Sequence, residues 1–375
     1  MSALSPTRRA VIDLEAFRHN VRTLAAVVAP AETMIAVKAD AYGHGMVPVA
    51  RAALEAGATS LAVLDIPAAL TLRDAGIDAP LFAWLHGPRS DFAAAIAAGV
   101  DLGVSALWQL EAILAARGAS RPRVHLKVDT GLSRNGASVA DWPGLVRRAV
   151  EVDAAGELRL HAAWSHLADA SVEDDEAALA RFREAVDVAE GEGARFPLLH
   201  LAASSAGLRM PAAHFGLVRF GIAAYGVSPF DDATGADLGL IPAMTVESEV
   251  ASVKRVPAGH GVSYGLTYRT DGETSLALVP LGYADGLPRV AGPRASLLLN
   301  GRRFPIAGRV AMDQVVLDVG DHPVAVGDRV VMFGPGGEGE PTAEEWAEWA
   351  KTIGDEIIAR VGHRVQRVYR NGSPR

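Results

Sequence analysis

One arrangement repeats from Met34 to Gly226: a short apolar run, a turn, and then an amphipathic stretch rich in alanine and leucine. The eight apolar runs are Met34–Ala39, Ser60–Leu64, Ala79–Trp84, Asp101–Ser105, Arg123–Asp129, Arg159–His166, Leu198–Ala203 and Leu217–Gly226. The helix-like segments are Met46–Gly57, Ile66–Gly76, Asp91–Gly99, Ala106–Gly118 and Asp175–Gly191, and each ends at a glycine, as expected just past a helix. Strands that alternate with helices indicate a parallel sheet, and eight such units predict a closed (β/α)8 barrel. An open doubly wound sheet is the alternative, but no Gly-x-Gly-x-x-Gly follows a predicted strand.

The pattern changes after about residue 230, where Phe230–Asp237 has the composition of a linker. The apolar runs that follow are Thr245–Val256, Thr274–Leu281, Ala295–Leu299, Gln314–Val319 and Arg329–Phe333. Gly, Pro, Asn and Asp separate them without helical periods, which is typical of a mostly antiparallel β domain. A single helix is predicted there, over Ala343–Thr352. We therefore predict two domains, a TIM-like barrel over residues 1–232 and a β-rich domain over residues 233–375.

The composition excludes several classes of function. A net charge of −8 without a long basic run provides no electrostatic footprint for nucleic acid. The chain has no cysteine, so it has no disulfide framework, no thiolate nucleophile and no cysteine-bearing metal site. No window approaches the roughly 18 apolar residues of a membrane span, and the start lacks the apolar core of a signal peptide. The expected location is the cytoplasm.

Polar residues follow most of the predicted barrel strands, at the ends where such barrels place their active sites. They are Lys38 and Tyr42 after the first strand, Lys127, Asp129 and Arg134 after the fifth, Ser165 and His166 after the sixth, Ser204 after the seventh, and Arg219, Gly221, Ile222 and Tyr225 at the eighth. Burial at a strand end favours the neutral, nucleophilic amine of Lys38. Barrels commonly bind phosphate after the seventh and eighth strands, where Ser204 and the amides of Ser205, Gly221 and Ile222 are suitable donors. A reactive lysine opposite a phosphate site predicts pyridoxal 5'-phosphate as cofactor.

Seven motifs in this order resemble those of the alanine racemases, which are two-domain, fold-type III pyridoxal-phosphate enzymes. They are Ala36-Val-Lys-Ala-Asp-Ala-Tyr-Gly-His-Gly45, Lys127-Val-Asp-Thr-Gly-Leu-Ser-Arg134, Trp164-Ser-His-Leu-Ala168, Arg219-Phe-Gly-Ile222, Val262-Ser-Tyr-Gly-Leu-Thr-Tyr268, Gly282-Tyr-Ala-Asp-Gly-Leu-Pro-Arg289 and Gly308-Arg-Val-Ala-Met-Asp-Gln314. The resemblance covers nearly the whole chain. It implies racemisation of L-alanine and D-alanine, which would supply D-alanine for peptidoglycan.

The resemblance also implies a role for each matched residue. Racemisation moves the α-proton from one face of Cα to the other, so two opposed bases are needed, and these would be Lys38 and Tyr264. A nearby cation, Arg134 or His166, would make the Tyr264 phenol more acidic. The implied cofactor contacts are Lys38, Tyr42, His166, Ser204, Arg219, Gly221 and Ile222, and the substrate contacts are Arg134 and the amide of Met312. Supporting residues are Lys127, which resembles a lysine that can be carbamylated, and Tyr283, Arg289 and Asp313.

Arg219 is the most informative of these positions. An arginine stays charged and cannot accept a proton from the pyridine nitrogen of the cofactor, so it would donate a hydrogen bond to an unprotonated nitrogen. The weaker electron sink favours simple return of the proton over transamination. In this family Tyr264, Tyr283 and Met312 reach the barrel of the second subunit, so the resemblance implies a homodimer with shared sites.

Two positions depart from the family pattern. Ala203 stands where an asparagine usually precedes the phosphate-binding serine, and Asp355 stands where a tyrosine usually meets the phosphate. A carboxylate beside a phosphate is repelled, so we expect Asp355 to point away or to line a wider, wetter channel, with weaker cofactor retention or a broader substrate range. These departures leave open a racemase of another small amino acid such as serine.

Two further readings stay open, a non-catalytic pyridoxal-phosphate-binding protein and a fold-type III decarboxylase. Tyr264 and the β domain argue against the first, and the absence of cysteine against the second. A metal site is not predicted, because His161 and His166 are five residues apart on a predicted strand and face opposite sides.

Overall fold

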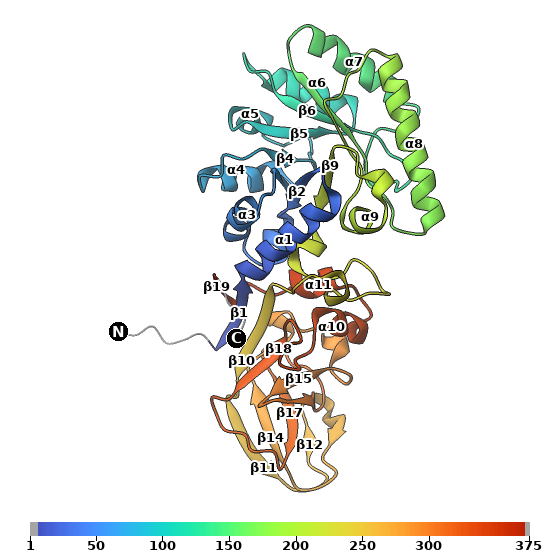
Figure 1. The fold of residues 1–375 in the computed structure, drawn as a ribbon. Helices are drawn as coiled ribbons and strands as arrows, with labels where there is room; N and C mark the ends of the chain where they lie inside the picture. Colours follow the sequence, from blue (N-terminus) through green and yellow to red (C-terminus); the bar gives the residue numbers. More distant parts are fainter. Residues whose placement is uncertain (1–6, 372–375) are drawn as a thin grey trace. The chain divides into compact units, whose positions relative to one another are not determined.

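The computed structural model describes residues 7–371 (Figure 1). The segment considered above for a signal peptide lies partly outside the described residues, in positions 1–6. Contacts group the chain into two compact units. The barrel unit holds residues 21–39 and 46–224, and the β-rich unit holds the described parts of 1–20, 40–45 and 225–375. The predicted domain boundary near residue 232 stays a proposal.

The barrel unit contains an eight-stranded parallel sheet in the order β8-β7-β6-β5-β4-β3-β2-β9, which confirms the predicted barrel. Its strands are β2 (Glu32–Ala36), β3 (Ser60–Val63), β4 (Leu81–Ala83), β5 (Val100–Val104), β6 (Arg123–Lys127), β7 (Arg159–Trp164), β8 (Leu198–His200) and β9 (Leu217–Phe220). The end strands β8 and β9 are joined by two backbone hydrogen bonds, from Gly216 N to Leu199 O at 3.2 Å and from Arg219 N to Ala202 O at 3.1 Å. The sheet is therefore nearly closed.

Helices follow the strands and cover the sheet (Figure 1). They are α3 (Met46–Glu55), α4 (Ile66–Asp74), α5 (Phe92–Ala97), α6 (Leu107–Ala116), α7 (Trp142–Ala154), α8 (Val172–Gly191) and α9 (Ser204–Arg209), and α1 (Leu14–Val28) precedes β2. The sequence predicted five of these, α3, α4, α5, α6 and α8, to within a few residues. Side chains fill the interior, where Phe82 stacks on His125 at a ring distance of 4.4 Å and meets Trp164 at 5.2 Å.

The chain reverses its backbone hand immediately after Lys38. In the short helix α2 (Lys38–Tyr42) the φ angles of Ala39, Asp40, Ala41 and Tyr42 are 52°, 53°, 54° and 51°. A left-handed residue other than glycine costs roughly 1–2 kcal/mol, and four in succession are uncommon. Strain of this kind is typical of functional sites, and it fixes the direction in which the chain leaves Lys38.

Within the described residues, the β-rich unit is built from antiparallel hairpins and carries two helices near its C-terminal end, where the sequence predicted one. Its elements are β1 (Arg8–Asp13), β10 (Met244–Glu249), β11 (Ser252–Val256), β12 (Gly261–Val262), β13 (Tyr268–Arg269), β14 (Thr274–Val279), β15 (Ser296–Leu299), β16 (Arg302–Pro305), β17 (Val315–Gly320), β18 (Arg329–Phe333), β19 (Gln366–Arg370), α10 (Ala343–Ala350) and α11 (Gly354–Ala359). The mostly antiparallel prediction is confirmed. The exception is the N-terminal strand β1, which pairs antiparallel with β10 and parallel with β19.

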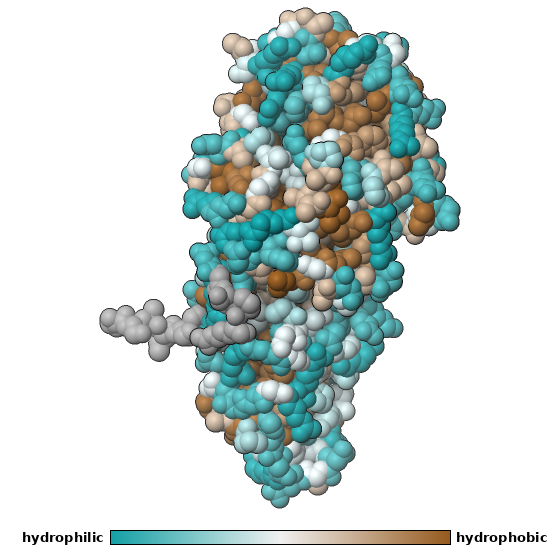
Figure 2. Space-filling model, in the orientation of Figure 1, coloured by the Kyte–Doolittle hydropathy of each residue, from teal (hydrophilic) through white to brown (hydrophobic). Residues whose placement is uncertain are grey.

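None of the helices within residues 7–371 is long and apolar enough to cross a membrane. On the face shown in Figure 2, hydrophobic patches interrupt a surface that is otherwise largely hydrophilic.

Candidate active site

Four cations gather around His166 at the carboxyl ends of the barrel strands. Burial lowers the pKa of His166 well below its ordinary value, and the charges of Arg219, Arg134, Lys127 and Lys38 lower it further. The imidazole is therefore uncharged near neutral pH. His166 is therefore not the cation that the sequence suggested for acidifying Tyr264, because burial and the four neighbouring cations both disfavour its charged form.

Arg219 is the buried centre of this group. Its side chain sits on β9 with the residue 7% exposed, and its guanidinium donates to the carbonyls of Ser165 and Leu201 at 2.8 and 2.9 Å. It also contacts Nδ1 of His200 at 2.8 Å and Nδ1 of His166 at 3.2 Å. Within the described residues all of these acceptors are neutral. Burial lowers the Arg219 pKa to about 9 because no carboxylate offsets the charge.

Lys127 ends β6 and is 4% exposed, with its Nζ 4.4 Å from the centre of the Trp164 ring. Burial lowers its pKa to about 8, and the charges of Arg219 and Arg134 add to this effect, while Asp129 opposes it. An appreciable fraction of neutral amine is therefore present near pH 8. A neutral amine is the form that can react with carbon dioxide.

The loop after β6 carries Arg134 at the surface. The carboxylate of Asp129 accepts hydrogen bonds from the backbone N–H groups of Gly131 and Ser133 at 3.0 and 3.1 Å. Ser133 has a φ of 56°, so it is held in the left-handed region just before Arg134. The side chain of Asp129 therefore shapes the turn that presents the arginine.

Ser204 and Gly221 lie together, as the sequence predicted for a phosphate site. The Ser204 hydroxyl oxygen accepts hydrogen bonds from the N–H groups of Gly221 at 3.1 Å and Ala223 at 3.4 Å. Its own hydrogen stays available for donation to a ligand, and Ile222 beside it is buried. Ala203 is the N-cap of α9 and makes no side-chain capping bond, so the group supplied by the family's usual asparagine is missing here.

Tyr42 and Asp355 lie in the β-rich unit. Tyr42 is 7% exposed, and burial raises the pKa of its phenol, with a further contribution from the negative charge of Asp355. Asp355 is half-buried in the first turn of α11. Its carboxylate is thus close enough to act electrostatically on a predicted cofactor contact, and whether it avoids the phosphate stays a prediction.

Three other predicted residues, Tyr264, Tyr283 and Met312, are exposed on the β-rich unit. Together with the exposed Leu266, which was not predicted, we call them the tyrosine patch: Tyr264, Leu266, Tyr283 and Met312. Their exposed fractions are 72%, 50%, 39% and 52%. Backbone hydrogen bonds join the Tyr283 and Met312 segments, from Tyr283 N to Ala311 O at 3.0 Å and from Ala284 N to Met312 O at 2.9 Å. The Tyr264 segment is joined to the same loop by the Ser263 hydroxyl, which donates to Arg309 O at 2.6 Å. Asp313 pairs with Arg364 at 2.7 Å, and Arg289 is exposed.

Gly282 permits the close approach of these two segments. A Cβ atom at this position would lie 2.2 Å from Met312 O, closer than any side chain tolerates. The glycine at the start of the Gly282–Arg289 motif is therefore required to place Tyr283 beside Met312.

Three site-associated residues were not singled out from the sequence, namely His200, His125 and Asp101. His200 ends β8 and contacts Arg219, while His125 precedes Lys127 by two residues on β6 and so shares its face of the strand. That two-residue period was the signal that could have found His125. Nothing comparable pointed to Asp101.

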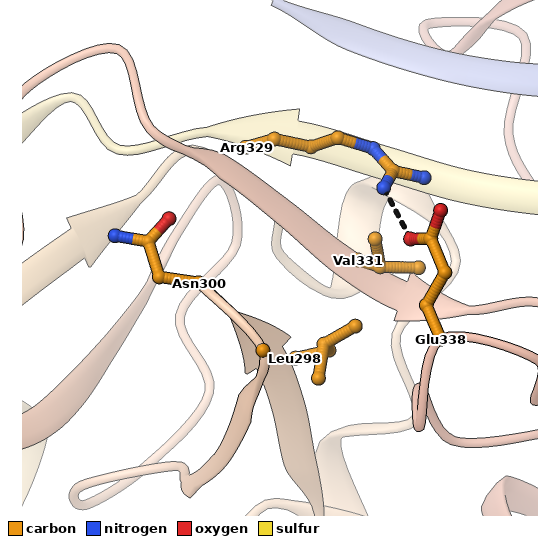
Figure 3. Close-up of a pocket in the computed structure, with 6 residues that line it drawn as sticks. Leu298, Asn300, Arg329, Val331 and Glu338 are labelled. Atoms are coloured by element: carbon orange, nitrogen blue, oxygen red, sulfur yellow. Dashed lines mark hydrogen bonds and ion pairs between the residues drawn. The ribbon is translucent and has the colours of Figure 1, made fainter.

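A separate depression of about 310 Å³ lies in the β-rich unit (Figure 3). Its lining residues are Leu298, Asn300, Gly301, Arg329, Val331 and Glu338. Arg329 is already paired there with Glu338, and also with Glu247 at 2.6 Å. The depression contains none of the predicted site residues and offers no unpaired cation for a ligand.

Comparisons with known proteins find relatives of this chain over almost its full length. The family model of the alanine racemase N-terminal domain matches residues 12–229, and that of the alanine racemase C-terminal domain matches residues 243–369. The chain is 52% identical over 366 residues to an alanine racemase of Frankia casuarinae, covering 96% of this chain and 95% of that protein. It is 50% identical over 372 residues to one of Thermobifida fusca, covering 98% and 99%. An alanine racemase structure from D-cycloserine-producing Streptomyces lavendulae superposes with a TM-score of 0.97 at 47% identity, covering 99% of each chain.

Proposed function

Because this chain belongs to the alanine racemase family of isomerases, we propose that it interconverts L-alanine and D-alanine with pyridoxal 5'-phosphate as cofactor. The observation that carries the proposal is the buried guanidinium of Arg219, which meets only neutral acceptors within a group of four cations. Such a group suits a ligand with a phosphate, a carboxylate and a ring nitrogen that accepts a hydrogen bond. We place the reaction in the cytoplasm, where its D-alanine would supply peptidoglycan synthesis.

The residues fit this cofactor. Arg219 would donate to the ring nitrogen, since it has no acceptor capacity of its own. Ser204 has a hydroxyl hydrogen to donate to a phosphate, and Gly221 and Ile222 lie beside it. Lys38, Tyr42 and His166 complete the proposed contacts. When bound, the cofactor withdraws electrons from Cα of an attached amino acid and so weakens its C–H bond.

Two bases would then handle the α-proton. Lys38 would remove and return it on the D-face, and Tyr264 on the L-face, with Arg134 and the amide of Met312 holding the substrate carboxylate. Tyr264, Tyr283 and Met312 belong to the exposed tyrosine patch of the β-rich unit, and Arg289 and Asp313 would border the entrance. We propose that this patch is covered by the barrel of a second copy in a homodimer, so that each site contains residues of both chains.

The direct test is α-proton exchange. Purified protein loaded with pyridoxal phosphate is incubated with L-alanine in deuterated water, and both optical rotation and α-deuteration are followed. We expect loss of optical rotation together with deuterium incorporation. Incorporation of deuterium without racemisation would indicate a one-base enzyme, and the absence of both would overturn the proposal.

The lowered pKa of Lys127 gives a testable pH dependence. Its pKa is about 8 in the folded protein against an ordinary value of 10.5, so between these two pH values the unfolded chain binds this proton more tightly. Stability should therefore rise as pH increases through this window, by about 3 kcal/mol at most. We expect the rise in the free energy of unfolding to be lost in Lys127→Met, measured by urea denaturation in buffer free of carbon dioxide.

Lys254→Met is the matched control, because Lys254 is exposed on β11. If the free energy of unfolding of Lys127→Met still rises over this pH range, the rise comes from another titrating group. In buffer equilibrated with carbon dioxide, the neutral amine of Lys127 is also the proposed site of carbamylation, which intact-protein mass spectrometry detects.

Serine racemisation is the second candidate function, because Asp355 stands where the family usually has a tyrosine. We predict that Asp355→Tyr binds pyridoxal phosphate several-fold more tightly, because removing a carboxylate near a phosphate is worth about 1 kcal/mol in a solvated site. We also expect its activity with L-serine to fall relative to that with L-alanine. Cofactor affinity is measured by titration of the cofactor-free protein.

Two further variants separate the effect of removing the Asp355 charge from the effect of adding the tyrosine ring. Asp355→Asn removes the charge without adding the ring, so it should recover the affinity but not the change in selectivity. Glu356→Gln alters the net charge equally at the adjacent position of α11, which is exposed, and should change neither. If Asp355→Tyr has the properties of the wild type, Asp355 has no influence on the site.

A further inference from the structure

A string of polar side chains runs through the barrel from Arg219 to the amino-terminal end of β5. Nη1 of Arg219 lies 2.8 Å from Nδ1 of His200, and Nε2 of His200 lies 3.0 Å from Nδ1 of His125. Nε2 of His125 then lies 3.4 Å from Oδ2 of Asp101, within ion-pair distance but without the alignment of a hydrogen bond. The other oxygen, Oδ1 of Asp101, accepts from Nε of Arg123 at 2.6 Å.

The string is shielded from water. The exposed fractions of Asp101, His125 and His200 are 5%, 1% and 0%. Aromatic rings pack on both imidazoles, since Phe82 stacks on His125 at 4.4 Å and Trp164 stacks on His200 at 5.5 Å. In surroundings without water each hydrogen bond is strong, and an arrangement in which two donors face each other costs free energy.

Arginine fixes the direction of every bond in the string. A guanidinium has only donors, so Nδ1 of His200 must accept, and a neutral His200 then carries its proton on Nε2. That proton is donated to Nδ1 of His125, which must therefore carry its own proton on Nε2, facing Asp101. The carboxylate is the one group here that can only accept, and it ends the string opposite the donor-only arginine.

The charge of Asp101 is secured at its end of the string. Burial alone would raise the pKa of this carboxyl group, but the contacts with His125 and with the guanidinium of Arg123 outweigh it. The pKa of Asp101 is accordingly lowered, and the group is a carboxylate near neutral pH.

A metal site is the competing interpretation of the same residues. Ligand atoms of Asp101, His125 and His161 lie within 4.8 Å of one another, and a register shift in the pairing of β6 with β7 lies beside His125 and His161. A metal on Nε2 of His125 would, however, move the proton of that ring to Nδ1. Two donors would then face each other at His200 or at Arg219. The cations Arg123 and Arg159, which lower the pKa of His161, also oppose a divalent ion.

We propose that Asp101 is a positioning residue for Arg219: its carboxylate faces Nε2 of His125 and holds the proton of that ring there, which fixes the tautomers of two buried histidines, so that His200 presents a lone pair to the guanidinium. This inference goes beyond the proposed function but rests on it for its consequence. If Asp101 is lost, His125 can adopt the other tautomer, and His200 then turns a donor toward Arg219. The arginine loses an acceptor and shifts away from its position at the proposed ring-nitrogen site.

The primary test is the tautomeric state of His200 in protein labelled with ¹⁵N-histidine, read from ¹⁵N shifts with and without pyridoxal phosphate. We expect wild-type His200 and His125 to carry their protons on Nε2. In Asp101→Leu we expect the His200 proton to move largely to Nδ1. A wild-type His200 protonated on Nδ1 would overturn the proposal without any variant.

Kinetics provide the second readout. Asp101→Leu should lower kcat by roughly ten- to hundredfold, by analogy with the loss of the outer partner of a metal-ligating histidine, with KM for alanine little changed. Asp101→Asn keeps an amide oxygen for His125 and should retain the tautomers and most of kcat. Asp153→Asn is the matched control, since Asp153, near the end of α7, also pairs with an arginine, Arg121, at 3.0 Å and accepts from the backbone N–H of Leu160 at 3.2 Å, but does not belong to the string.

A double-mutant cycle separates positioning from general destabilisation. In His125→Asn the amide oxygen takes the place of Nδ1 and can accept from His200 without help from Asp101. Adding Asp101→Leu to this variant should therefore cost nothing further. If the two substitutions lower kcat independently, so that their losses multiply, Asp101 is merely structural. An unchanged His200 tautomer in Asp101→Leu would lead to the same conclusion.

The outcomes also separate this inference from the proposed function. The tautomers are read in the cofactor-free protein, so they stand even if wild-type protein fails to racemise alanine. If Asp101→Leu does not fold, a comparison of His125→Leu with His125→Asn replaces it. Only His125→Asn keeps an acceptor for the Nε2 proton of His200, so only that variant should keep the wild-type tautomer of His200. Added zinc chloride that binds stoichiometrically and shifts the His125 and His161 resonances would favour the metal interpretation instead.

Discussion

Lys38→Ala should abolish racemisation in both directions, with a loss of roughly three to four orders of magnitude or more, because one residue is proposed both to hold the cofactor and to act as a base. The position of Lys38 supports this double role. It follows the buried strand β2 and is itself half-buried, and its charge contributes to the lowered pKa of His166. The left-handed turn that begins at Ala39 fixes the backbone immediately after it.

The measurement is α-proton exchange with L-alanine and with D-alanine, together with the absorbance of the bound cofactor. Lys38→Ala should lose the wild-type absorbance band while still binding pyridoxal phosphate non-covalently, since Arg219 and Ser204 remain. Added methylamine should restore part of the D-face exchange by supplying a free amine. Lys254→Ala, at an exposed position on β11, should behave as the wild type. Retention of exchange in Lys38→Ala would assign the base to another group.

The barrel could be predicted from sequence because its signals are local. Each strand–helix unit carries its own apolar run and turn, and the residues that end the strands are read directly from the chain. Lys127, Ser204 and Arg219 were found in this way, because parallel strands bring their carboxyl ends to one edge. The predicted helices matched for the same reason.

The features that the sequence could not show depend on strand register and on the pairing of strands that lie far apart in the chain. The string from Arg219 to Asp101 requires three side chains from β5, β6 and β8 to meet inside the barrel, and the register between β6 and β7 shifts beside His125. Strand β1 joins β19 although more than 350 residues separate Arg9 from Gln366. The charge state of His166 was also misjudged, because burial and the four cations that keep it neutral depend on the packing of three segments far apart in the chain.

Tyr264→Phe should remove one face of the reaction only. Without the phenol, exchange of the α-proton of L-alanine should fall by roughly two to four orders of magnitude, the usual contribution of a positioned acid–base group. Exchange with D-alanine should persist, because Lys38 can remove and return a proton on its own face. The ratio of the two exchange rates therefore reports the assignment of bases, whereas a structural defect would lower both rates together. Tyr283→Phe, in the same exposed patch, is the matched control and should keep the ratio near that of the wild type.

Mixing the two inactive variants then tests whether the site is shared between subunits. If Tyr264 serves the barrel of the partner, a heterodimer of Lys38→Ala and Tyr264→Phe chains has one doubly defective site and one intact site. Random exchange of subunits makes half of the dimers heterodimers, so about a quarter of the wild-type activity should return. If Tyr264 instead served the barrel of its own chain, every site in the mixture would lack one base and no activity would return. Recovery that is lost on dilution would place the proposed base and the proposed lysine on opposite sides of a dissociable interface.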